Sequence, residues 1–92
     1  MIKSFIHKGL QKFYENGTTK GIQSSHAKKL KMRLLALDTA FVLEDLSLPG
    51  FNLHKLKGDR ADIYSIKVNG NWRITFRFLD GDVEIVNYED YH

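Results

Sequence analysis

Residues 63–88 read IYSIKVNGNWRITFRFLDGDVEIVNY, a stretch in which aromatic and β-branched side chains recur around two glycine-containing dipeptides. The strand-like runs are residues 63–68, 72–79 and 83–88. Asn69-Gly70 and Asp80-Gly81 separate these runs, and both favour the positive φ angles of a type I′ turn. The stretch therefore predicts a three-strand antiparallel meander.

Alternation within the meander predicts which side chains share a face. In the central run, apolar and polar residues alternate: Trp72, Ile74, Phe76 and Phe78 against Arg73, Thr75 and Arg77. We expect the apolar face to pack on helices, which leaves Arg73 and Arg77 on the more open face. Asp90, Tyr91 and His92 follow the last run without a flexible linker, so His92 is expected to lie next to the sheet.

Two helices are predicted before the meander. Residues 7–16 place their apolar side chains on one helical face, with Gly17 as the C-terminal cap. The second helix follows Ser24 or Ser25, either of which can cap it. Its apolar residues recur at i, i+3, i+7 and i+10, namely Ala27, Leu30, Leu34 and Leu37. Its basic residues mostly occupy the other side, and they are Lys28, Lys29, Lys31 and Arg33. His7 and His26, beside the two helix starts, are expected at the surface.

Shorter segments complete the expected architecture. Residues 1–5 and 51–56 have the patterns of strands, and residues 41–48 are expected to form a short turn of helix that ends before Pro49-Gly50. Gly58-Asp59-Arg60 is expected to be a polar loop. The chain is thus predicted to be a single α+β domain, residues 1–92, with two N-terminal helices packed on an antiparallel-rich sheet.

Composition and charge narrow the class of protein. The chain has no cysteine and no run near the roughly 18 apolar residues that span a bilayer, so we expect a cytoplasmic protein without membrane contact. Residues 1–37 have a formal charge of +7 and residues 38–92 one of −4. A basic half suits RNA, with Lys28 and Lys31 as candidate contacts. A solvated lysine-rich helix face explains the same pattern equally well.

Several residues could together cleave RNA. Metal-free cleavage needs a base for the 2′-hydroxyl, an acid for the leaving 5′-oxygen and cations for the phosphate. His54 and His92 suit either proton role, and Asp90 can orient His92 or act as a base. Tyr91 can donate a proton or stack on a nucleobase. The candidate cations are Lys57, Arg60 and Arg73.

Each of these residues also has an ordinary explanation. His54 lies between Leu53 and Leu56, which fits a partly buried strand residue, and strict alternation puts it on the opposite face from Lys57. A strand arginine such as Arg73 is often simply ion-paired. The histidines and Asp90 show no recognisable ligand spacing, so no metal or other cofactor is expected.

Three segments, in order, resemble the HigB-type toxins of the RelE superfamily: LHKLKGDR (53–60), SIKVNGNWRI (65–74) and NYEDYH (87–92). With the opening MIKSF, the resemblance extends over essentially the whole chain. It implies a toxin of a type II toxin–antitoxin system, a ribosome-dependent mRNA endonuclease that acts in the A site beside 16S rRNA. It also implies a HigA-like helix-turn-helix antitoxin, with operator DNA bound only through that antitoxin.

The same resemblance implies six catalytic positions, which are His54, Lys57, Arg73, Asp90, Tyr91 and His92. Arg60, Arg77, Lys28 and Lys31 remain candidate RNA contacts. Two alternatives stay open. ParE-type toxins share the fold and inhibit DNA gyrase, but they lack the terminal DYH and the His54–Lys57 pair. A non-catalytic RNA-binding module would use the basic helix face as its main contact.

Overall fold

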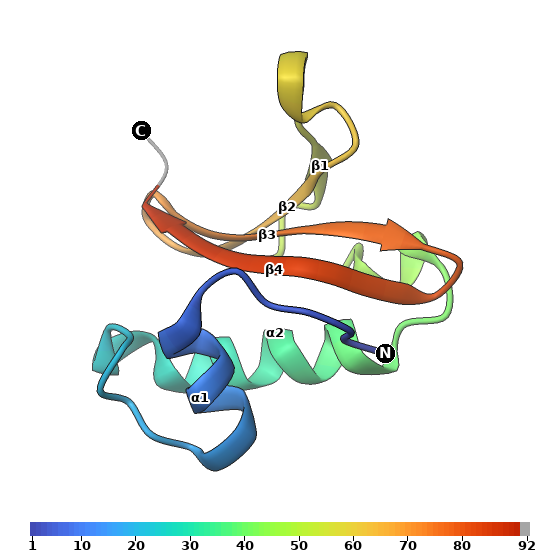
Figure 1. Cartoon of the computed structure of the whole chain (residues 1–92). Helices are drawn as coiled ribbons and strands as arrows, with labels where there is room; N and C mark the ends of the chain where they lie inside the picture. Colours follow the sequence, from blue (N-terminus) through green and yellow to red (C-terminus); the bar gives the residue numbers. More distant parts are fainter. Residues whose placement is uncertain (91–92) are drawn as a thin grey trace.

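Residues 1–90 are described by a computed structural model, in which two helices lie on one side of a four-stranded sheet (Figure 1). The helices are α1 (Lys8–Asn16) and α2 (Ala27–Thr39). The strands are β1 (His54–Lys55), β2 (Tyr64–Asn69), β3 (Trp72–Leu79) and β4 (Asp82–Asp90). They adjoin in that order and every neighbouring pair is antiparallel. The predicted α+β architecture and its meander are confirmed.

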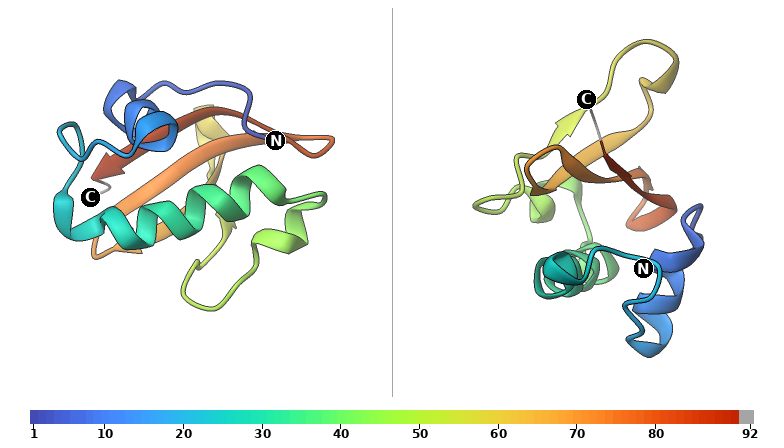
Figure 2. Two further views of the ribbon diagram at one scale, coloured as in Figure 1. Left: turned by 90° about the horizontal axis from the view of Figure 1, so that it is seen from below. Right: turned by 90° about the vertical axis from the view of Figure 1, so that its left-hand side faces the viewer.

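The core lies between the helices and the apolar face of β3. Ile74 and Phe76 are fully buried there, as are Leu30 and Leu37 of α2. Burying one such side chain stabilises the fold by about 1.5–3 kcal/mol relative to leaving it exposed. The right-hand view of Figure 2 places the helices below the sheet and the connection after β1 above it. The other face of the sheet is therefore the face available to a ligand. Within residues 1–90, no helix combines the length and apolar character needed to cross a membrane.

The two meander turns differ in geometry. Asp80 and Gly81 have φ angles of +50° and +84°, and a type I′ turn requires positive values at both positions. Asn69 instead ends β2, and Gly70 and Asn71 make the first turn. Only Gly70 has a positive φ there, +57°, which is the pattern of a type II′ turn. The prediction placed this turn one residue too early, and a register shift between Lys67 and Asn69 accompanies the change.

The strands predicted at residues 1–5 and 51–56 are largely replaced by isolated contacts. Residues 1–6 run parallel to β4 with bridges at Ile2–Val83 and Phe5–Val86 only. A register shift in β4 separates those bridges and puts Ile85 at φ +47°, with its N–H donating to Ser4 Oγ at 2.8 Å. Of residues 51–56, only His54 and Lys55 are in a strand.

Two 3₁₀ turns take the places of predicted helix features. η2 (Leu43–Leu46) confirms the short turn expected within residues 41–48. η1 (Ser24–His26) contains both serines that were expected to cap α2, and no side chain caps that helix. The capping prediction was therefore wrong, because the serines lie inside the turn that leads into α2.

Two polar side chains that were predicted at the surface are buried. Arg33 is 8% exposed, and its Nε donates to the carbonyl of Lys67 at 2.6 Å while its guanidinium lies over the Phe51 ring. His26 is 5% exposed and forms a hydrogen bond with the Tyr88 hydroxyl. His7 is half-buried, and its Nδ1 caps α1 by accepting from the Leu10 N–H. Arg33 and His26 therefore attach α2 and the turn before it to the sheet.

Candidate active site

Cross-strand pairing gathers polar side chains on the face of the sheet away from the helices, which we call the open face. Its two rows are His54–Ser65–Thr75–Asn87 and Lys67–Arg73–Glu89. Directly paired residues point to the same side of a sheet, so His54 and Arg73 share this face in neighbouring rows. Of the four predicted catalytic residues within 1–90, the structure thus brings two together on one polar surface.

His54 is exposed on β1 and has a defined proton arrangement. Its Nδ1 lies 3.0 Å from the backbone oxygen of Asn52. A carbonyl oxygen only accepts, so Nδ1 holds the proton and Nε2 is the acceptor in the neutral ring. His54 is therefore not the partly buried strand residue considered as an alternative, and its Nε2 can accept a proton at the open face.

Arg73 is held by the turn that precedes β3. Its Nη1 donates to the backbone oxygen of Gly70 at 3.0 Å and to its neighbour Trp72 at 3.3 Å. Both acceptors belong to the backbone, so the charge of Arg73 is oriented without being neutralised by them. A guanidinium that is oriented in this way can donate hydrogen bonds to a phosphate oxygen.

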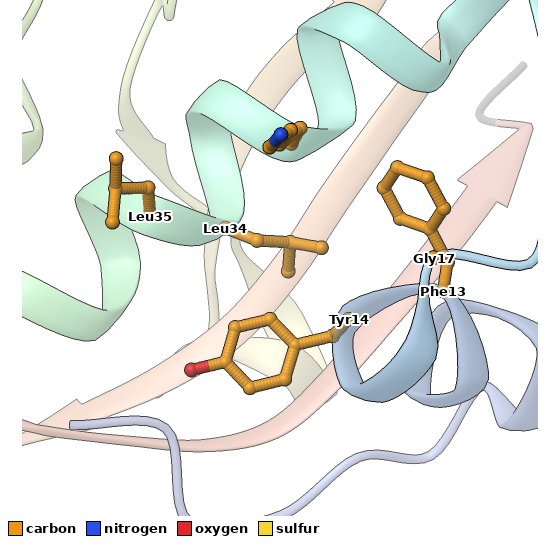
Figure 3. Close-up of a pocket in the computed structure, with 6 residues that line it drawn as sticks. Phe13, Tyr14, Gly17, Leu34 and Leu35 are labelled. Atoms are coloured by element: carbon orange, nitrogen blue, oxygen red, sulfur yellow. The ribbon is translucent and has the colours of Figure 1, made fainter.

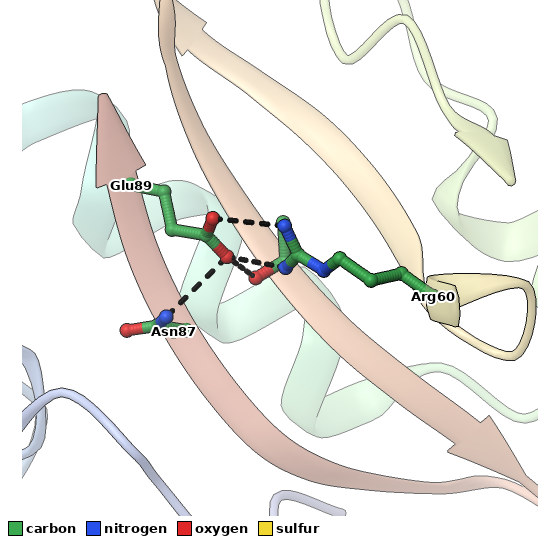
Figure 4. Close-up of polar contacts among 4 residues, drawn as sticks. Arg60, Asn87 and Glu89 are labelled. Atoms are coloured by element: carbon green, nitrogen blue, oxygen red, sulfur yellow. Dashed lines mark hydrogen bonds and ion pairs between the residues drawn. The ribbon is translucent and has the colours of Figure 1, made fainter. Parts of the chain in front are cut away.

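Glu89 is the centre of a polar cluster on the open face (Figure 4). Arg60 donates to its carboxylate through Nη1 at 3.1 Å and Nη2 at 2.6 Å. Thr75 Oγ1 donates at 2.5 Å and Asn87 Nδ2 at 3.3 Å. Thr75 is only 2% exposed, so this part of the open face is covered by the cluster. Arg60, a predicted RNA contact, does lie at the open face, but its guanidinium is bound there to the Glu89 carboxylate.

The other candidate RNA contacts divide between the two sides of the molecule. Arg77 shares the alternation of Arg73 and bonds Glu84 at 2.9 Å, with Asp62 at 3.6 Å. Hydrogen bonding and attraction by Glu84 raise the pKa of Arg77. Lys28 and Lys31 are exposed on α2, and the structure does not bring them to the open face because α2 covers the opposite face.

The remaining catalytic candidates lie in the connection beside the open face, on the opposite alternation of the sheet or beyond the described residues. Lys57 is exposed and immediately precedes η3 (Gly58–Arg60), in the connection that rises beside the open face. Asp90 ends β4 opposite Trp72, so it has the alternation of the helix side rather than that of Glu89. Tyr91 and His92 lie outside the described residues. Among residues 1–90, no three or more His, Asp or Glu side chains are grouped to hold a metal ion.

A buried aromatic cluster supports the end of β4 from the helix side. The Tyr88 ring lies 4.5 Å from the Trp72 ring, centroid to centroid, and its hydroxyl is 2.6 Å from His26 Nδ1. His7 contacts the same tyrosine edge-on, with centroids 5.3 Å apart. Burial, and then the charge of Lys29, lower the pKa of His26, and burial lowers that of His7.

These lowered pKa values make stability depend on pH. The unfolded histidines titrate near their ordinary pKa of about 6.5, so the unfolded state binds more protons as the pH falls below that value. Stability is thus present above about pH 6.5 and is lost as the pH falls toward the folded pKa values. We expect the free energy of unfolding, measured with urea, to decrease from about pH 7.5 to about pH 5.5. His26→Gln should show a smaller decrease, and an equal decrease in both proteins would contradict this assignment.

The apolar pocket between α1 and α2 is separate from the open face (Figure 3). Its volume is about 460 Å³. The lining residues are Phe13, Tyr14, Gly17, Lys31, Leu34 and Leu35. Lys31 is the only candidate RNA contact among them, and no candidate catalytic residue within 1–90 lines this pocket. It therefore adds no group to the proton chemistry of the open face.

Glu89 and Thr75 are the site residues that sequence reasoning missed. Their signal was present in the meander, where Arg73 and Arg77 alternate with Thr75 opposite a strand containing Glu84 and Glu89. Opposite charges on adjacent antiparallel strands indicate cross-strand pairs. The partner that could not be read in this way is Arg60, because it comes from a loop outside the meander.

Comparisons with known proteins find relatives that match all or nearly all of the chain. Residues 3–92 match the model of a family described as RelE-like toxin of type II toxin–antitoxin system HigB. Endoribonuclease HigB of Proteus vulgaris is 50% identical over 92 residues and covers all of both chains. Toxin HigB-1 of Vibrio cholerae serotype O1 is 35% identical over 94 residues, which cover 100% of this chain and 98% of that protein.

A solved structure is similar in fold at low sequence identity. The YoeB–YefM complex from Staphylococcus aureus contains a chain that superposes with a TM-score of 0.63 at 19% identity. The match covers 100% of this chain and 98% of the other. At that identity the likeness concerns the fold alone.

Proposed function

The chain belongs to the HigB-like family of RelE-like toxins from type II toxin–antitoxin systems, and we propose that it is an endoribonuclease that cleaves mRNA in the ribosomal A site. A relative named endoribonuclease is 50% identical over the full length of both chains. The observation that carries the proposal is the open face, where strand pairing puts His54 and Arg73 in neighbouring rows and His54 keeps Nε2 as an acceptor. A proton acceptor and an oriented cation on one surface suit attack on a phosphodiester.

The chemistry is metal-independent acid–base catalysis. A base takes the proton of the 2′-hydroxyl, whose oxygen then forms a bond to the adjacent phosphorus. The bond from phosphorus to the 5′-oxygen breaks, and an acid gives that oxygen a proton. We assign the proton transfers to Asp90 and His92, and nucleotide positioning or assistance to His54 and Tyr91. Lys57 and Arg73 stabilise the charge on the phosphate.

RNA binding and inhibition need further partners. Arg60 and Arg77 lie on the side of the open face, whereas Lys28 and Lys31 are on the opposite side, where they suit 16S rRNA rather than the cleaved strand. The proposed inhibitor is a HigA-like helix-turn-helix antitoxin, which would bring operator DNA to the complex. The small number of bases within the site implies little cleavage of RNA away from the ribosome.

The experiment that tests the proposal is the mapping of new mRNA 5′ ends after the protein is induced in cells. Ends with a 5′-hydroxyl group, clustered in frame at codons, are expected from a ribosome-bound nuclease of this chemistry. The same measurement separates it from gyrase inhibition and from RNA binding without cleavage, both of which leave mRNA intact.

A further inference from the structure

Glu89 connects three separate parts of the chain on the open face. Its carboxylate accepts hydrogen bonds from Arg60 of η3, from Thr75 of β3 and from Asn87 of its own strand (Figure 4). The contact with Arg60 is bidentate, because two guanidinium nitrogens bond the two carboxylate oxygens. A bidentate pair fixes direction as well as distance, so Glu89 determines where the Arg60 guanidinium lies.

Arg60 belongs to a loop that is attached to the sheet at a few points. At its base, Leu56 and Ile63 are buried, and the Leu56 N–H donates to the Ile63 carbonyl at 2.8 Å. Nearer its tip, Arg60 bonds Glu89, and Asp62 lies 3.6 Å from Arg77. The two ion pairs have opposite polarity, one with the cation on the loop and one with the cation on the sheet. Both pairs connect the loop that includes Lys57 to the sheet, and the Arg60–Glu89 pair is the shorter and less exposed of the two.

Glu89 is an acidic side chain on the surface that is proposed to bind RNA, and an unbalanced carboxylate there would repel phosphate. Burial alone would raise the pKa of Glu89, but hydrogen bonds from Arg60 and Thr75 and the charge of Arg60 outweigh it, and the pKa is lowered. Glu89 is therefore ionised at neutral pH. Its charge is balanced by the same arginine that it orients.

We propose that Glu89 is a positioning residue of the nuclease site, which holds the loop bearing Lys57 and Arg60 at the distance from the open face that the substrate phosphate requires. The inference rests on the proposed function. It assigns Glu89 no contact with the reacting atoms. Its effect passes through the loop, so its loss should slow the chemical step while the ribosome still binds.

The test compares Glu89→Gln with Glu84→Gln in single-turnover cleavage of mRNA on purified, programmed ribosomes. Glu84 is a matched control, because it lies on the same strand and also bonds an arginine of the sheet. Glu89→Gln is expected to lower the maximal rate about tenfold with little change in half-saturation, since small misplacements of catalytic groups are costly. Glu84→Gln is expected to retain nearly the wild-type rate.

An unchanged or increased cleavage rate of Glu89→Gln would have a different physical cause. If Glu89 only repels RNA, its neutralisation should leave the rate unchanged or raise it, and that outcome would overturn the inference. Thermal unfolding of each variant shows that it is folded. Should Glu89→Gln fail to fold, Arg60→Gln breaks the same ion pair from the loop and is expected to lower the rate similarly. Intact mRNA with the wild-type protein would instead overturn the proposed function.

Discussion

Replacing His54 and Asp90 together with alanine is expected to slow cleavage of ribosome-bound mRNA by at least about 100-fold, because proton transfer by positioned side chains contributes about 10²–10⁴ to a rate. The two residues are changed together because the proposed chemistry is shared among several groups, so a single substitution leaves partial activity. His54 lies on the open face with Nε2 as its acceptor nitrogen, and Asp90 ends β4 directly before Tyr91 and His92 in the sequence. Single-turnover cleavage on programmed ribosomes measures the effect.

A matched control changes one residue in each of the same two strands. Lys55→Ala with Asp82→Ala alters β1 and the opposite end of β4, and it should keep the rate within about threefold of wild type because neither residue has a proton role. Both double variants should unfold at similar temperatures. Cleavage by the His54 and Asp90 variant within tenfold of wild type would show that the proton chemistry resides elsewhere.

Arg33→Met is expected to lower the free energy of unfolding by about 2–3 kcal/mol, the cost of leaving buried hydrogen-bonding groups without a partner. Arg33 donates to the carbonyl of Lys67 at 2.6 Å and to that of Gly50 at 3.4 Å, and its guanidinium lies 4.6 Å from the Phe51 ring centroid. Methionine replaces the apolar stem but supplies no donor. The connection from Gly50 to β1 thereby loses its attachment to α2.

Chemical denaturation of Arg33→Met and Lys31→Met measures the difference. Lys31 is exposed on the same helix, so its replacement should change stability by less than about 0.5 kcal/mol. Equal stability of the two variants would mean that Arg33 is a surface residue, as its place in the helical charge pattern suggested.

The meander was predictable because its signals are local. Alternating side chains place residues on faces, and glycine supplies the positive φ that a tight turn needs, which located all three strands to within two residues and both turns to within one. The type of the first turn was not predictable, because a glycine next to asparagine, such as Gly70, fits either a type I′ or a type II′ turn. The difference depends on the pairing of β2 with β3.

The anchoring contacts were not predictable because their partners are distant in the sequence. Arg33 bonds a carbonyl 34 positions away, His26 a hydroxyl 62 positions away, and Glu89 an arginine 29 positions away. Arg33 and His26 are polar residues in or beside a helix, and the helical pattern therefore predicts that their side chains are exposed. The loop that carries Arg60 has no regular strand pattern, so its approach to β4 had no local signal.

For the candidate site, the sequence suggested which residues take part but little of their geometry. His54 and Arg73 share a face because strand pairing is regular, and Lys57 follows Leu56 in the connection that rises from that side of the sheet (Figure 1). Asp90 has the opposite alternation, so strand geometry alone does not bring it to His54. Its catalytic assignment, like those of Tyr91 and His92, rests on the resemblance of NYEDYH to the family.

Cleavage of mRNA is tested most directly by mapping mRNA 5′ ends in cells that express the protein and in cells that express a variant with His54, Asp90 and His92 replaced by alanine. New 5′-hydroxyl ends, in frame at codons of translated messages, are expected with the wild-type protein and should be absent with the triple variant. Growth arrest with intact mRNA and altered DNA supercoiling would contradict mRNA cleavage and indicate gyrase inhibition.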